Sequence, residues 1–322
     1  MKQTKLVEQA RGTAASFFVL FLFAIAIASD TYAGTYQFDR TDGTKLTYYL
    51  DTPGAIATFP LFVYISGSVC NGVRPAHENY LQLLQYKIGV LSLEKRGFPS
   101  ASPNCPDEYL RNNTIGDRIQ DHLAVIAHLR KHLPNWNRKV VWAGGSEGGG
   151  LASLLAPLAP ETAIVVAMAA GGGMSMGEEL ILLTRKRLQK EGATQEQIES
   201  EVHALRTQYQ EIYRNPTADK EWLSDGKRAR NTYKWWASIL PIKSVLALEQ
   251  VDVPIYLVHG TLDESTPVES ANLVADRFQS LGKNNLTYKR DVGLDHQWRD
   301  EKGISHAAEV TAEAFRWLIS HL

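Results

Sequence analysis

The sequence predicts an α/β protein built on a mostly parallel sheet of eight strands. Short apolar runs bounded by Gly and Pro alternate with longer segments of helical periodicity, which is the pattern of strand–helix–strand units. The chain has 322 residues, of which 44% are hydrophobic and 21% charged. It can therefore bury a sizeable core, which excludes intrinsic disorder as a description of the whole chain.

Charge and cysteine content narrow the classes of function. The chain carries 34 basic and 35 acidic side chains, so no net field draws it onto nucleic acid or an anionic membrane surface. Two cysteines are too few for a disulfide-framework protein or a four-cysteine zinc site. They could form one bridge or remain two unrelated thiols. We expect no nucleic-acid partner.

The first 33 residues predict a secretory signal peptide. Three basic residues, Lys2, Lys5 and Arg11, precede an uninterrupted run of small and apolar residues at 13–28. Small residues follow, and cleavage after Ala28 or after Ala33 fits them equally. The alternative is an uncleaved N-terminal anchor, because the run falls just below the roughly 17–25 residues that span a bilayer. We expect a secreted or periplasmic protein with no stable membrane insertion once the leader is removed.

The strands follow from apolar runs with turn residues at both ends. The run 60–66 and the run 138–143 are rich in β-branched and aromatic residues, as buried parallel strands are. The predicted strands are 36–40, 44–51, 60–66, 87–94, 138–143, 162–168, 253–259 and 285–291.

The helices follow from apolar residues at steps of three and four. In the segment 114–133, for example, Ile119, Leu123 and Ile126 recur at helical spacing. The predicted helices of the core are about 75–86, 114–133, 147–158, 267–281 and 304–321.

The alternation stops between residue 174 and about residue 250. Residues 194–213 instead form one amphipathic helix within highly charged surroundings. A helical insertion over an α/β sheet indicates a cap, although a peripheral helix pair without a role at the site fits the same pattern. We therefore expect a signal peptide at 1–33, a core at 34–173 and 251–322, and a helical cap at 174–250.

The strongest local motif is Gly144-Gly145-Ser146-Glu147-Gly148. It directly follows the predicted strand 138–143 and directly precedes a helix. A Gly-x-Ser-x-Gly in this setting is a strained turn that lifts the serine hydroxyl out of the sheet edge, and glycines avoid a clash where strand and helix fold back. The plainer alternative is a glycine-rich packing turn. In the functional interpretation, Ser146 is a nucleophile and the following helix N-terminus stabilises an oxyanion.

A serine nucleophile needs a base and an orienting acid. Asp263 follows the strand 253–259 in the motif His259-Gly-Thr-Leu-Asp263, and His296 follows the strand 285–291 in a Gly-Leu-Asp-His motif. All three residues come after carboxyl ends of strands, where open α/β sheets assemble their sites. Glu264, Asp291 and Asp295 are spare acids, and His259 is interpreted as a strand-end residue rather than a base.

Together with Glu94-Lys-Arg-Gly97, these motifs resemble the α/β-hydrolase fold family. The nearest likeness is to bacterial esterases, serine aminopeptidases and prolyl-oligopeptidase-like catalytic domains, and it covers about residues 35–173 and 251–322. The resemblance implies an eight-stranded α/β-hydrolase core and a triad of Ser146, Asp263 and His296.

The resemblance also implies a second oxyanion donor in the loop after the third strand. Many members have His-Gly there, whereas this chain reads Ile65-Ser-Gly67-Ser68. Because backbone N–H groups do the work in an oxyanion hole, the missing histidine is tolerable. We expect the amides of Glu147 and Ser68 to be the donors, with Gly67 as their neighbour. In the same frame, the loops that carry Cys70 and Cys105 leave the sheet at one edge, so a bridge between these cysteines is geometrically possible.

Three other patterns give weaker predictions of function. His128 and His132 have metal-pair spacing but lack the Glu of a His-Glu-x-x-His motif, so we interpret them as a solvated helix face. The glycines at 171–173 lack the lysine of a phosphate loop. Glu178 and Glu179 could bind a substrate ammonium, although a charged cap face is the plainer interpretation.

The sequence therefore predicts an exported serine hydrolase that needs no cofactor and no metal. An ester of a small molecule is the expected substrate, and a short peptide or amide is the alternative. A catalytically silent protein of the same fold that only binds a ligand is the hypothesis from another class.

Overall fold

The computed structural model describes residues 32–54, 58–98, 106–133, 135–222 and 231–322. Most of the predicted signal peptide and Cys105 lie outside these residues, so neither the leader nor the Cys70–Cys105 bridge is tested and both stay predictions. The strands of the main sheet are β1 Tyr32–Asp39, β2 Lys45–Thr52, β3 Phe59–Ile65, β4 Gly89–Leu93, β5 Trp136–Gly145, β6 Thr162–Met168, β9 Ile255–Gly260 and β10 Leu286–Asp291.

The main sheet has eight strands in the order β1-β2-β4-β3-β5-β6-β9-β10. From β4 to β10 every neighbouring pair is parallel, whereas β2 is antiparallel to both β1 and β4. The predicted mostly parallel sheet is confirmed. The core helices are α1 Arg74–Asn79, the 3-10 helix η1 Leu81–Tyr86, α2 Asp107–Asn112, α3 Ile115–His132, α4 Glu147–Leu155, α9 Val268–Ser280 and α10 Ala307–His321.

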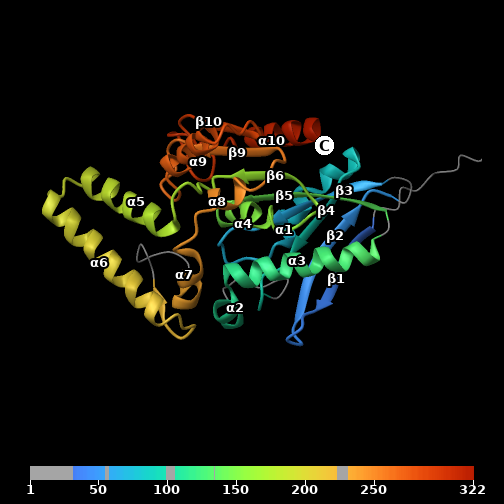
Figure 1. Ribbon diagram of the computed structural model, residues 1–322, viewed down its shortest axis with the longest axis horizontal. Helices are drawn as coiled ribbons and strands as arrows, with labels where there is room; N and C mark the ends of the chain where they lie inside the picture. Colours follow the sequence, from blue (N-terminus) through green and yellow to red (C-terminus); the bar gives the residue numbers. More distant parts are fainter. Residues whose placement is uncertain (1–31, 55–57, 99–105, 134, 223–230) are drawn as a thin grey trace, which may run out of the picture.

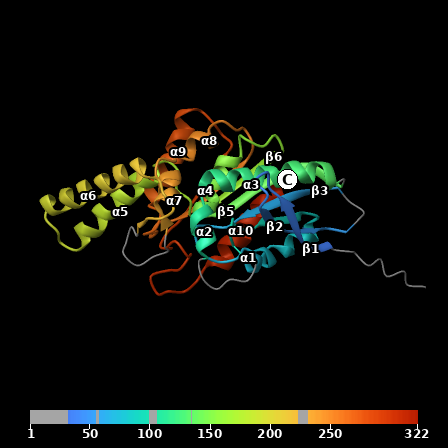
Figure 2. The ribbon, with the colours of Figure 1, turned by 90° about the horizontal axis from the view of Figure 1, so that it is seen from below.

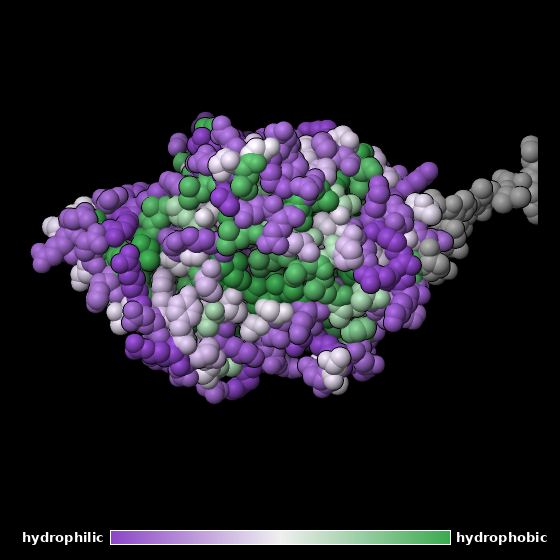
Figure 3. All heavy atoms as spheres, in the orientation of Figure 1, coloured by the Kyte–Doolittle hydropathy of each residue, from purple (hydrophilic) through white to green (hydrophobic). Residues whose placement is uncertain are grey.

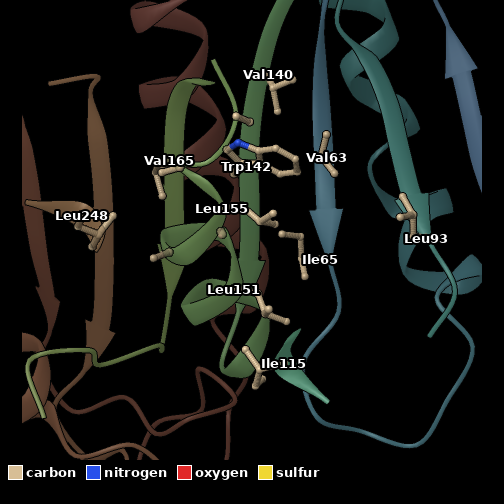
Figure 4. Close-up of a cluster of buried hydrophobic side chains, with 14 of the residues drawn as sticks. Val63, Ile65, Leu93, Ile115, Val140, Trp142, Leu151, Leu155, Val165 and Leu248 are labelled. Carbon is tan, nitrogen blue, oxygen red and sulfur yellow. The ribbon is translucent and has the colours of Figure 1, made fainter. Parts of the chain in front are cut away.

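Helices cover both faces of the sheet (Figure 1). Along β5, Trp142 packs in one apolar cluster with residues of α3, α4 and α9, while the next residue, Ala143, belongs to a second cluster with η1 and α10. Alternate side chains of a strand point to opposite faces, so both faces of these central strands are buried. In Figure 4, Leu151 and Leu155 of α4 face Ile65 of β3 across the first cluster.

Two helices differ from their predicted bounds for local reasons. The single helix expected at 75–86 is divided, because the chain continues after Tyr80 as a tighter 3-10 helix that ends at Lys87 with φ 59°. The C-terminal helix begins at Ala307, because the Asp300 carboxylate accepts N–H groups of a turn before it. The short helix α2 was not predicted.

The segment between β6 and β9 is mostly helical. It contains α5 Met176–Lys190, α6 Gln195–Arg214, a two-stranded pair of β7 Glu221–Trp222 and β8 Asn231–Thr232, α7 Tyr233–Ile239 and α8 Val245–Leu248. Helices α5 and α6 lie side by side and extend away from the core (Figures 1 and 2). No helix among the described residues is both long and apolar enough to cross a bilayer.

Candidate active site

Ser146 stands on a strained turn between β5 and α4. Its backbone has φ 54° and ψ −129°, a region that costs a non-glycine residue about 1–3 kcal/mol. The Ser146 N–H donates to the Met168 carbonyl of β6 at 2.8 Å, which ties the turn to the neighbouring strand. A Cβ on Gly148 would lie 2.0 Å from the Ile65 carbonyl oxygen, so only glycine lets α4 approach β3 this closely. The motif is therefore the predicted strand–turn–helix elbow.

Asp263 and His296 are brought together from two different loops. The Nδ1 atom of His296 lies 2.7 Å from Oδ2 of Asp263. Because a carboxylate can only accept, Nδ1 carries the proton and Nε2 keeps its lone pair. The Asp263 side chain is fully buried, whereas the His296 side chain is 24% exposed. The pair can thus hold an imidazole ready to accept a proton at its open end.

The Asp263 carboxylate is fixed on its other side by the backbone. Its Oδ1 accepts the N–H groups of Ser265 and Thr266, each at 2.8 Å. A Cβ on Gly260 would lie 2.3 Å from the Leu294 carbonyl oxygen, so β9 approaches the loop of His296 closely at this point. Two loops that are distant in sequence are therefore held in register at one sheet edge.

The spare acids have other partners. Asp295 accepts the N–H groups of Gln297 and Arg299 at 2.8 Å, so it shapes the turn that carries His296. Asp291 pairs with Lys289, and Glu264 is exposed and pairs with Lys190. Among these acids, Asp263 is the one that contacts His296.

His259 is buried within β9 beside the same carboxylate. Its Nε2 lies 2.9 Å from the Thr266 carbonyl oxygen and 3.4 Å from Oδ2 of Asp263. Burial lowers the pKa of His259, which favours the neutral ring. Such a ring donates from Nε2 to the Asp263 loop and supports it, in keeping with the interpretation of His259 as a strand-end residue rather than a base.

Ser146 lies at the same edge, directly after β5, and β6 lies between β5 and β9. No hydrogen bond within the described part of the chain joins its hydroxyl to His296, and the acid–base pair is formed without it. Catalytic hydrogen bonds are often long in the absence of substrate and tighten in the reacting complex.

The loop after β3 passes close to Ser146. A Cβ on Gly67 would lie 3.6 Å from Cβ of Ser146 and 3.3 Å from the Gly145 carbonyl oxygen. Gly67, which directly precedes the predicted oxyanion donor Ser68, therefore lies beside the elbow. Figure 3, which has the orientation of Figure 1, shows that hydrophobic residues gather in the middle of the visible face, around α4.

A pocket opens beside Ser146, with walls from the core and from the insertion. Ser146 and Glu147 line this pocket, and most of its other residues are apolar. The large apolar side chains among them are Ile115, Leu151, Leu154, Met174, Met176, Ile239 and Ile242. Because Met176 lies on α5 and Ile239 on α7, part of the insertion forms the wall of this pocket.

Glu179 of α5 also lines this pocket, which the sequence did not indicate. The interpretation of a charged cap face holds for Glu178, which is exposed and pairs with Lys243, and is wrong for Glu179, which is 3% exposed. Burial raises the pKa of Glu179 to about 7, although hydrogen bonds with Ser270 and the Gly172 backbone act in the opposite direction. A helix with adjacent glutamates gives no signal for which of them faces inward.

Two buried cations lie behind the loop after β3, and sequence reasoning missed both. Arg118 of α3 pairs with the Glu147 carboxylate and donates to the Ser66 carbonyl at 2.6 Å. The Lys95 ammonium donates to the Val69 carbonyl at 2.5 Å. Burial, followed by the nearby Arg118 charge, lowers the pKa of Lys95 to about 7. A basic residue in an amphipathic helix or after a strand normally predicts exposure, so no local signal marks these two.

The described residues contain no cluster of three or more His, Cys, Asp or Glu side chains placed to hold a metal ion. His128 and His132 stack on each other on α3, with ring centroids 4.2 Å apart.

The described groups at the sheet edge can supply a hydroxyl, an imidazole and a carboxylate, which is the set that acyl transfer requires.

Comparison with protein families adds the decisive observation. The family described as X-Pro dipeptidyl-peptidase (S15 family) matches residues 111–299, which is more than half of the chain. The chain belongs to this S15 family. The matched segment contains Ser146, Asp263 and His296 but not the loop of Gly67 and Ser68. No curated protein matches the chain in sequence.

Solved structures place this S15 chain in the α/β-hydrolase fold. Est1E from Butyrivibrio proteoclasticus is 17% identical, with a TM-score of 0.59 over 90% of this chain and 99% of that chain. The acylaminoacyl peptidase of Pyrococcus horikoshii is 13% identical, with a TM-score of 0.59 over 91% of this chain and 42% of that one. A monoacylglycerol lipase of Paleococcus ferrophilus is 16% identical, with a TM-score of 0.52 over 87% and 100%. These structures show the fold, and membership of the S15 peptidase family identifies the chain as a hydrolase.

Proposed function

We propose that the chain is an exported serine hydrolase that cleaves carboxylic esters of small molecules, with Ser146, His296 and Asp263 as its catalytic triad. The observation that carries the proposal is the 2.7 Å hydrogen bond between His296 and buried Asp263, at the sheet edge that also carries the strained Ser146 elbow. The largely apolar pocket beside Ser146 suits an acyl or aryl group.

In the proposed reaction, the Ser146 hydroxyl oxygen attacks the ester carbonyl carbon and its proton passes to Nε2 of His296. Asp263 holds the ring through Nδ1 and stabilises the imidazolium. The ester C–O bond then breaks, and His296 returns the proton to the leaving oxygen. Water, deprotonated by His296, then attacks the acyl carbon; the bond to Ser146 breaks, His296 returns the proton to the Ser146 oxygen, and the acid is released.

Backbone N–H groups of Glu147 and Ser68, next to Gly67, stabilise the negative oxygen of each tetrahedral intermediate in this proposal. Support comes from the position of Gly67 beside Ser146 and from the start of α4 at Glu147. Export is part of the same proposal and rests on the N-terminal sequence alone, with a retained N-terminal anchor as its alternative. Fractionation of producing cells tests it.

Substitution of the nucleophile tests the reaction. Ser146→Ala should lower the turnover of a short-chain aryl ester by about 10⁶-fold, since the hydroxyl forms the bond. Ser153→Ala is a matched control, because Ser153 is a buried serine of α4 whose hydroxyl donates to the Gly149 carbonyl at 2.9 Å. That variant should keep its turnover. Turnover retained by Ser146→Ala would end the proposal.

A second candidate, hydrolysis of short peptides or aminoacyl amides, is favoured by Glu179. A buried carboxyl in an otherwise largely apolar pocket is suited to bind a substrate ammonium, and the S15 family description names a peptidase. With a pKa of about 7, the carboxyl becomes charged as the pH rises through neutrality. Binding of a cationic substrate should therefore tighten between pH 6 and pH 8, and binding of a neutral ester should not.

Aminoacyl anilides with a free and with an acetylated amine separate the two candidates. Glu179→Gln should raise KM for the free amine about tenfold or more and leave the acetylated substrate unchanged. Glu178→Gln is the control, because Glu178 is exposed and a glutamine preserves its capping box. Equal KM values for both anilides in the wild type would exclude ammonium recognition by Glu179.

A further inference from the structure

Arg118 reaches from α3 to both sides of the nucleophile. The residue is 4% exposed, and its guanidinium contacts two segments that are distant in sequence. One terminal nitrogen pairs with the Glu147 carboxylate, and the other donates to the Ser66 carbonyl oxygen at 2.6 Å. The planar guanidinium can hold two acceptors in a fixed relation, which a lysine ammonium on its flexible stem does not do.

The two contacted segments are the ones that flank Ser146. Glu147 directly follows Ser146 and begins α4, and Ser66 directly precedes Gly67, whose position adjoins the Ser146 side chain. The Ser66 carbonyl also shares a peptide group with the Gly67 N–H. A donor on this carbonyl fixes the plane of that peptide and polarises its N–H group.

The loop after β3 is also held at its far end. There the Lys95 ammonium donates to the Val69 carbonyl at 2.5 Å. The loop is thus fixed by a buried basic side chain at each end, but of these two only Arg118 also contacts the segment that begins α4. The separation between the two proposed oxyanion donors is therefore set through the Arg118 guanidinium.

We propose that Arg118 is a positioning residue for the oxyanion hole, which sets the distance between the Gly67–Ser68 loop and the Glu147 amide. This inference rests on the proposed function, because it assigns a role only if Ser146 attacks a carbonyl. It differs from a merely structural ion pair in one respect. Catalysis requires the link to the Ser66 carbonyl in addition to the pair with Glu147.

A charge-balanced double variant separates the two roles. Arg118→Met alone leaves the Glu147 carboxylate buried without its cation and is expected to lower the melting temperature. Arg118→Met combined with Glu147→Gln removes both charges and should restore that temperature. The Ser66 carbonyl still lacks its donor, so kcat for an aryl ester should stay about 100-fold low while KM changes less than about threefold.

Arg118→Lys keeps the positive charge, so this variant is expected to fold. It should pair with Glu147 but lose the second contact, and so reduce kcat and the rate of Ser146 labelling by a fluorophosphonate together. Arg40→Lys is the control, because Arg40 is a half-buried arginine that holds Asp121 through two hydrogen bonds of 2.9 and 2.8 Å and does not line the pocket beside Ser146. It should leave kcat unchanged.

Recovery of kcat together with the melting temperature in the double variant would overturn the inference. So would wild-type kcat in a folded Arg118→Lys protein. Ser146→Ala, assayed in parallel, identifies which claim has failed. If it remains active, the proposed function is wrong, whereas an inactive Ser146→Ala beside a fully active Arg118→Lys removes the positioning role alone.

Discussion

The sheet edge and the proposed cap, the mostly helical segment at 174–250, are held by different kinds of interaction. At the sheet edge, backbone geometry and buried hydrogen bonds fix each functional group, as the N–H groups of Ser265 and Thr266 fix Asp263. In the cap, α5 and α6 pack through an apolar seam, and exposed ion pairs such as Arg185 with Glu199 connect their outer faces. The sheet edge can therefore hold reacting groups in precise positions, whereas the cap can vary in sequence and shape the pocket.

The largest expected effect comes from the acid at the sheet edge. Asp263→Asn retains the shape of the side chain but lets an amide face His296, which favours the wrong tautomer of the ring. We expect kcat for an aryl ester to fall about 10⁴-fold, or about 5.5 kcal/mol of transition-state stabilisation. Asp295→Asn, which should preserve the acceptor of its turn, is the matched control. A loss below tenfold in Asp263→Asn would contradict the role of Asp263.

The elbow should tolerate substitution as poorly as the acid. In Gly148→Ala the new Cβ would lie 2.0 Å from a backbone oxygen of Ile65, which no side-chain rotation relieves. We expect a loss of unfolding free energy of about 3 kcal/mol or more, measured by denaturant titration. Gly150→Ala is its neighbour on the same helix and meets nothing within 4 Å. Its stability should equal or exceed that of the wild type, and equal losses in the two variants would contradict the packing at the elbow.

A substitution in the cap should lower stability but have almost no effect on the chemical step. Ile212 of α6 is fully buried in the apolar cluster that includes Tyr209, Trp235 and Trp236. Ile212→Ala should cost about 2–5 kcal/mol of unfolding free energy, with kcat for an aryl ester within a few-fold of wild type. A kcat loss as large as that of Asp263→Asn would show that the cap takes part in the chemistry.

The smallest effect is expected on the outer face of the cap. Arg185 pairs with Glu199 in the solvent, where such pairs contribute little. Arg185→Ala should leave both the melting temperature and kcat unchanged. A clear drop in melting temperature would indicate that the exposed ion pairs, and not the apolar seam, hold α5 against α6.

The same contrast explains which parts of the fold and the site could be predicted from the sequence. The ends of the strands before Ser146, Asp263 and His296 were predictable within a few residues. For β5 and β9 the signal is a run of buried apolar residues, whereas β10 before His296 lies at the end of the strand order and has no buried residue. The amphipathic helix expected at 194–213 is found at Gln195–Arg214 for a similar reason. These signals are local in the chain.

What the sequence could not supply depends on contacts between distant elements. Burial of Glu179 depends on how α5 sits over Ser270 and Gly172, and its neighbour Glu178 is chemically identical. The partners of Arg118 lie 52 and 29 residues away. Helical periodicity reports which face of a helix is apolar, but not which charged side chain finds a buried partner elsewhere.

The most direct test of the central claim is the site of covalent labelling by a fluorophosphonate, mapped by mass spectrometry of peptides from the full chain. An activated serine is required for this reaction. The triad assignment predicts one adduct, on Ser146, with loss of ester turnover in proportion to labelling and much slower labelling in His296→Ala. An adduct on another serine, or unlabelled protein that still turns over the ester, would contradict it.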